Sequence, residues 1–90
     1  MFGKTKLAQF KAAELPQEAQ SAWDGSAVDE LIGAEYKPVL YVGNQTVHGT
    51  NYIFYAEQKL LDFKNDRRLV RVVINGDSEY KVVSIEPLEP

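Results

Sequence analysis

The stretch LVRVVINGDSEYKVVSI, residues 69–85, decides the fold because it reads as two β-strands joined by a tight turn. Residues 69–74 and 80–85 are rich in β-branched side chains, which are typical of strands. Asn75-Gly76-Asp77 between them is a strong turn signal, since these residues accept the backbone angles of a tight hairpin. With alternate side chains on opposite faces, one face is predicted to be apolar and to carry Val70, Val72, Ile74, Val83 and Ile85.

Two more strands are predicted upstream of this hairpin. Residues 38–42 are short, β-branched and apolar, and residues 52–56 form the most aromatic run of the chain. A longer polar connection over residues 59–68 separates them from the hairpin, and Pro87 ends the last strand. The strands follow one another as a meander, which indicates an antiparallel sheet.

An amphipathic helix is predicted ahead of the strands. Pro16 suits the first turn of a helix, and Gly33 is well placed to end it. Between them, apolar residues recur at helical spacing and form a stripe of Ala19, Ala22, Trp23, Ala27, Leu31 and Ile32. Gly25 lies inside this segment and marks a bend or a break. Trp23, the only tryptophan, is expected in the core because it belongs to the stripe.

These elements predict an α+β domain in which one N-terminal helix packs across a four- to five-stranded antiparallel sheet. The strand count depends on the first fifteen residues, which have weak alternating character and read as a loose arm or an edge strand. The chain of 90 residues has no internal repeat, so residues 1–90 are predicted to form a single domain.

Composition argues against several functions. The chain has no cysteine and only one histidine, His48. It therefore cannot form a disulfide or a thiolate metal site, and it lacks the residues for most catalytic triads. We therefore expect no enzyme activity, no metal and no cofactor. The net charge of −3 argues against nucleic-acid binding, and no apolar run approaches the ~18 residues that span a bilayer. A cytoplasmic location is expected if Met1 is the native start, and a secreted or periplasmic one if a signal has been removed.

Charge is distributed unevenly along the chain. Residues 14–35 carry acids but no lysine or arginine, whereas residues 1–11 and 59–71 are basic. Such runs are typical of solvated faces that attract one another weakly, and a docking surface is the alternative.

Residues 43–52, Gly-Asn-Gln-Thr-Val-His-Gly-Thr-Asn-Tyr, join the first two predicted strands and resemble the first inhibitory hairpin of the cystatins. Gln45, Val47 and Gly49 fill the three fixed positions of the family signature Gln-Xaa-Val-Xaa-Gly. Thr50-Asn51-Tyr52 continues the match. The order of arm, helix, strand, signature, strand, connection, strand, turn and strand extends the resemblance over nearly the whole chain.

The resemblance implies a reversible inhibitor of papain-like cysteine proteases, which acts as a wedge that occludes the active-site cleft. The N-terminal arm, the signature hairpin and a second hairpin would line up along one edge of the domain. Gly49 would allow close approach of the backbone, Val47 would give apolar contact and Gln45 would brace the turn. The implied protease-binding residues are Gly3, Gln45, Thr46, Val47, His48, Gly49, Asn75 and Gly76.

The chain departs from the family pattern in the arm and in the second hairpin. Residues 75–79 are polar and acidic, where many cystatins carry Pro-Trp and stefins a leucine–proline pair. Gly3 is followed by Lys4 and Lys6, where small or apolar residues are usual. His48 also stands where a small residue is usual. The alternative function is a non-inhibitory cystatin-fold module, which binds another protein or serves as an accessory domain.

A monomer is expected at low concentration, with a domain-swapped dimer as the alternative. The signature loop at residues 45–49 is short, and its straightening would let two chains exchange the helix and the first strands. Size-exclusion chromatography distinguishes these two states.

Overall fold

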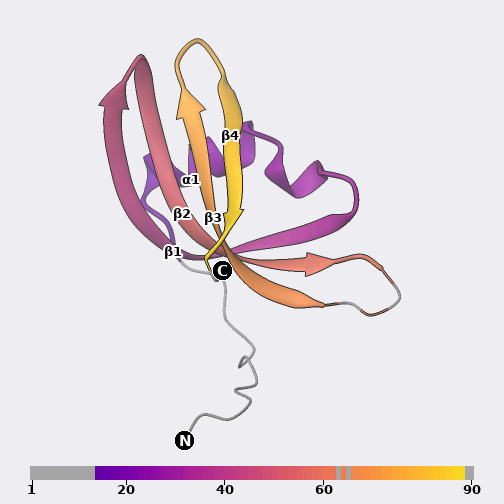
Figure 1. The fold of residues 1–90 in the computed structure, drawn as a ribbon. Helices are drawn as coiled ribbons and strands as arrows, with labels where there is room; N and C mark the ends of the chain where they lie inside the picture. The colour runs from indigo at the N-terminus through magenta and orange to yellow at the C-terminus, as the bar shows by residue number, and fades with distance from the viewer. Residues whose placement is uncertain (1–13, 63, 65, 89–90) are drawn as a thin grey trace, which may run out of the picture.

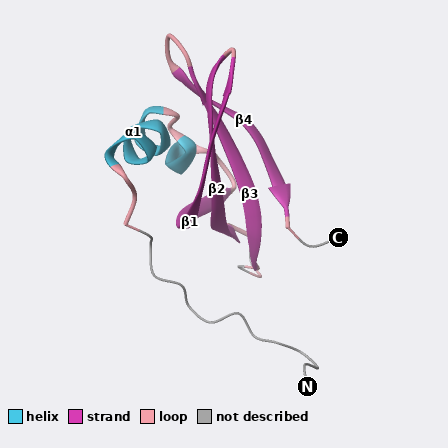
Figure 2. Ribbon diagram, turned by 90° about the vertical axis from the view of Figure 1, so that its left-hand side faces the viewer, coloured by secondary structure: helices cyan, strands magenta, loops and turns pink. Residues whose placement is uncertain are grey.

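A four-stranded antiparallel sheet carries a helix on one face in the computed structural model, which describes residues 14–62, 64 and 66–88 (Figure 1). The helices are α1, Gln17–Gly25, and the short 3-10 helix η1, Val28–Glu30. The strands are β1, Ala34–Val47; β2, Gly49–Leu60; β3, Arg67–Gly76; and β4, Tyr80–Pro87. Figure 2 shows α1 beside the sheet, where it covers one face. The coarse prediction of an α+β fold with an antiparallel meander is confirmed.

The strands lie in the order β1-β2-β3-β4, and all four predicted strands form. Each is longer than the apolar pattern indicated, and β1 and β2 are separated by His48 alone. The arm predicted ahead of the helix falls largely at residues 1–13, outside the described residues.

The helix is shorter than predicted. α1 begins after Pro16 as expected, but it ends at Gly25 instead of continuing to residue 32. Ala27 then adopts a left-handed backbone, with φ of 59°, and the chain turns into η1. Packing explains the glycine, because a side chain on Gly25 would collide with the ring of Tyr80. The predicted break at Gly25 is therefore confirmed, and the predicted continuation beyond it is wrong.

The early end of α1 changes which residues are buried. Val28 reaches the core from η1, although it lay outside the predicted stripe. The last three residues of that stripe are exposed; these are Ala27, Leu31 and Ile32. Gly33 has φ of 95° and lies in the turn that leads into β1, so it does not end a helix.

The core lies between α1 and the sheet. Its buried residues are Ala19, Ala22, Trp23, Val28, Phe54, Ala56, Val70, Val72 and Ile74. The ring of Phe54 meets that of Trp23 edge-on at 5.1 Å between centroids, and it lies 5.3 Å from that of Tyr41. Trp23 also donates through Nε1 to the carboxylate of Asp29, at 3.2 Å. The predicted core position of Trp23 is confirmed.

The pairing of β3 with β4 differs from the predicted register. A β-bulge between Val73 and Ile74 places Ile74 opposite Val82. Val82 packs against the core, whereas Val83 is 57% exposed. The extra residue of a bulge shifts the alternation of side chains by one position. The predicted core position of Val83 is therefore wrong, while Ile85 packs against the core as predicted.

Alanine substitutions at the two valines test this register. Val82→Ala should lower the free energy of unfolding by about 1 kcal/mol, because it removes methyl groups that pack against the core. Val83→Ala should change it by less than about 0.5 kcal/mol, because the side chain is exposed. Urea denaturation followed by circular dichroism measures both. A greater loss from Val83→Ala than from Val82→Ala would contradict the bulge.

Candidate functional site

Two hairpin turns lie side by side at the same end of the sheet. The first hairpin joins β1 to β2, the second joins β3 to β4, and both turns lie at the top of Figure 1. Antiparallel pairing of Thr50 with Gly76 and of Asn51 with Asn75 places the two turns side by side. The chain meanders through adjacent strands, so turns after alternate strands lie at the same end.

We call residues 45–49 and 75–79 together the hairpin edge. It unites all of the implied protease-binding residues except Gly3, which lies outside the described residues. The structure therefore brings together two of the three elements that the resemblance assigns to one surface.

The first hairpin turns within very few residues. Thr46 pairs with Thr50, and Val47 pairs with Gly49, so His48 alone forms the connection. Gly49 has φ of 84°, a left-handed conformation that glycine adopts without steric cost. The exposed side chains at this tip are those of Gln45, Thr46, Val47 and His48. The tip therefore presents a narrow, protruding surface with one exposed apolar side chain.

Gly49 lies directly against the second hairpin. A Cβ atom at this position would collide with the carbonyl oxygen of Gly76 and would lie 3.0 Å from Cβ of Asp77. Glycine is thus required here by two conditions, its backbone angle and the closeness of the neighbouring turn. The resemblance predicted a glycine for close approach to a protease, and the structure shows close approach to the second hairpin.

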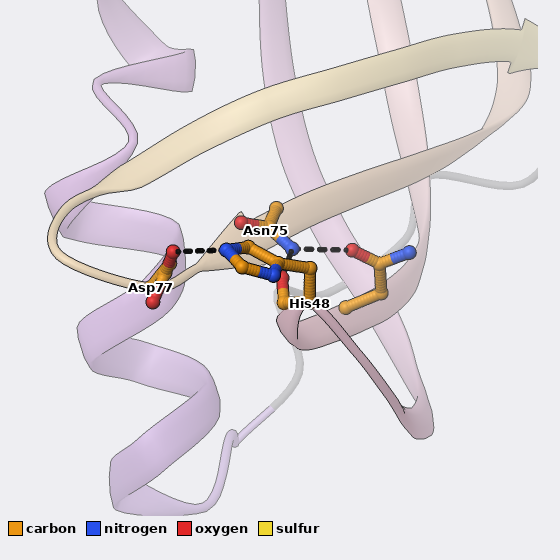
Figure 3. Close-up of polar contacts among 4 residues, drawn as sticks. His48, Asn75 and Asp77 are labelled. Carbon is orange, nitrogen blue, oxygen red and sulfur yellow. Dashed lines mark hydrogen bonds and ion pairs between the residues drawn. The ribbon is translucent and has the colours of Figure 1, made fainter.

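Asn75 connects the two hairpins (Figure 3). Its Nδ2 donates to the carbonyl oxygen of His48, at 3.0 Å, and to Oδ1 of Asn51, at 2.9 Å. Nε2 of His48 also contacts a carboxylate oxygen of Asp77, at 3.4 Å, from an imidazole that is 98% exposed. The side chain of Gln45, which was expected to brace the turn, is exposed and makes no hydrogen bond within the described residues.

An aromatic pair supports the hairpin edge from inside. The ring of Tyr80 lies between Gly25 and Gly76, and a Cβ atom on either glycine would collide with it or crowd it. Tyr52 meets Tyr80 edge-on, with 6.3 Å between the ring centroids. Burial raises the pKa of the Tyr52 hydroxyl, and Tyr80, Tyr41 and Glu18 add to the rise. The sequence patterns did not identify this support, because the contact of Gly25 with Tyr80 joins segments far apart in the chain.

A hollow of about 260 Å³ lies at the opposite end of the sheet. Its lining residues are Glu35, Tyr36, Lys37, Glu57, Lys59 and Arg67. Lys37 pairs with Glu57 at 3.7 Å and Lys59 pairs with Glu35 at 3.9 Å, so these charges link β1 to β2.

Within the part of the chain that the structure describes, no group of three or more His, Cys, Asp or Glu side chains could hold a metal ion. None of the helices there is long and apolar enough to cross a membrane. Comparisons of the chain with protein-family models, with curated proteins and with solved structures give no match. The hairpin edge itself offers a narrow, protruding surface with one exposed apolar side chain, that of Val47.

Proposed function

We propose that the chain is a reversible protein inhibitor of papain-like cysteine proteases, and that the hairpin edge is the wedge that enters the active-site cleft. The proposal rests on where the signature residues lie. Gln45–Gly49 forms a tight tip at one end of the sheet, and the second hairpin lies beside it. One helix across an antiparallel meander also agrees with the cystatin-like architecture that the resemblance implies.

The proposed mechanism is occlusion of the cleft. The residues of the tip pair with each other across the turn, so their backbone is not free to bind along the cleft as a single extended substrate chain would. Val47 is 46% exposed, and burial of its free surface in the cleft would contribute about 1 kcal/mol to binding. Inhibition is reversible because no covalent bond forms.

The second hairpin determines how strongly the chain is expected to bind a protease. Asp77 and Glu79 are exposed there, and the turn holds no aromatic residue to serve as an anchor. Loss of a central aromatic anchor weakens an interface by about 2–4 kcal/mol. Such a loss converts nanomolar affinity to affinity near micromolar. The same polar turn favours the second candidate function, a non-inhibitory interaction module of cystatin-like fold.

Aspartate substitutions at two valines of β1 test the proposed contact. Val47→Asp places a charge at the tip and should raise the inhibition constant for papain at least about tenfold. Val42→Asp is a matched control, since Val42 is 47% exposed in the same strand but lies outside the hairpin edge. This control should inhibit as the wild type does. Equal inhibition by Val47→Asp and the wild type, with both chains folded by circular dichroism, would contradict the assignment of the tip.

A further inference from the structure

We propose that Asn75 is a positioning residue, which holds the tip of the first hairpin in its binding shape. The second hairpin then acts as a brace for the first. The inference rests on the proposed function for what the tip binds, whereas the contacts that carry it belong to the free chain.

The amide group of Asn75 is suited to this role. An asparagine NH₂ group has two hydrogens, and Nδ2 of Asn75 has two acceptors, the carbonyl oxygen of His48 and Oδ1 of Asn51. The first acceptor belongs to the single connecting residue of the tip, and the second belongs to the strand that leaves it. One side chain therefore fixes both the turn and its base.

The tip needs such a brace because its own connection is so short. His48 alone joins β1 to β2, and Gly49 holds a left-handed φ of 84°. Because glycine adopts many backbone angles at little cost, contacts with the surrounding structure must select this one. Here the surrounding structure is the second hairpin, which meets Gly49 at the Gly76 carbonyl and His48 at Asp77. A tip that is ordered before binding loses less conformational entropy when it enters a cleft.

Asn75→Asp is the decisive variant, because it keeps the size of the side chain and removes the donor. The amide of Asn51 can turn to donate to the new carboxylate, whereas the carbonyl of His48 then lacks this donor. Asn75→Ala is the second variant and introduces no charge. Asn44→Ala is the matched control, since Asn44 is exposed in β1, lies outside the hairpin edge and donates its amide to the hydroxyl of Tyr41.

Two readouts separate positioning from general support of the fold. The first is the inhibition constant for papain, which should rise about tenfold in both Asn75 variants. The second is hydrogen exchange of backbone amides in the whole chain. Exchange should become faster at residues 46–50 and stay unchanged at residues 70–74 of β3. Asn44→Ala should match the wild type in both measurements.

The exchange measurement keeps this inference distinct from the proposed function. Unchanged exchange at residues 46–50 in both Asn75 variants would overturn the positioning role. Faster exchange throughout the sheet would also overturn it, because Asn75 would then support the fold as a whole. If the faster exchange is confined to the tip while the wild type fails to inhibit papain, the positioning role stands and the proposed function fails.

Discussion

Phe54→Ala is expected to lower the free energy of unfolding by about 3–5 kcal/mol, as large-to-small substitutions at buried aromatic residues do. Phe54 is fully buried and contacts both Trp23 of α1 and Tyr41 of β1. Its removal leaves a cavity at the junction between the helix and the sheet. Small domains are stable by only about 5–15 kcal/mol, so the variant should be close to unfolded at moderate urea concentrations.

Urea denaturation monitored by the fluorescence of Trp23 measures this loss, because Trp23 packs on the substituted side chain. Leu40→Ala is the control, since Leu40 is 51% exposed in the neighbouring strand. It should change the free energy of unfolding by less than about 0.5 kcal/mol. A loss below about 1 kcal/mol in Phe54→Ala would mean that the helix does not pack on the sheet as described.

Gly49→Ala is expected to lower the free energy of unfolding by roughly 2–3 kcal/mol and to weaken papain inhibition at least tenfold. Two effects add at this position. An alanine at φ of 84° is strained, and its Cβ atom would collide with the carbonyl oxygen of Gly76. Relief of that collision would separate the two hairpins and disturb the tip.

Gly33→Ala shows the first of these effects, backbone strain, without the second. Gly33 has φ of 95°, close to that of Gly49, but no atom lies near its Cβ position. This control should cost about 1 kcal/mol from backbone strain alone and should leave inhibition unchanged. Urea denaturation and an inhibition assay on both variants give the comparison. Equal losses of stability at the two glycines would contradict close contact between the hairpins.

Local sequence signals predicted the presence of the main elements. Pro16 indicated the start of the helix, and β-branched or aromatic runs indicated all four strands. Such signals depend on neighbours within a few residues, which the sequence displays directly. Their boundaries were less well predicted, since strand ends such as Ala34–Lys37 are polar or mixed and pair only because β2 continues beside them.

Contacts between distant segments decided the features that the sequence did not predict. The break at Gly25 was predicted, but its packing partner Tyr80 was not, because no pattern near residue 25 identifies that partner. The bulge in β4 exchanges the faces of Val82 and Val83, although both are valines in the same run. Alternation alone places such residues correctly only when the strand pairing is regular.

In the candidate site, too, local features could be predicted and contacts between distant segments could not. The position of the first hairpin could be predicted, because the signature lies between two strand patterns. The role of Asn75 could not, because its bond to His48 joins residues 27 positions apart. The resemblance implies that Asn75 contacts a protease, which stays a prediction, and in the free chain its amide reaches the neighbouring hairpin.

The most direct test of the proposed wedge is a titration of papain with the purified wild-type chain. Residual activity on a fluorogenic peptide is measured at increasing concentrations of the chain. Occlusion of the cleft by the hairpin edge predicts reversible, competitive inhibition at low-micromolar concentrations or below. Full papain activity at about 100 µM of the chain, where even a weakened wedge would bind, would contradict the proposed function. That result would favour the non-inhibitory module.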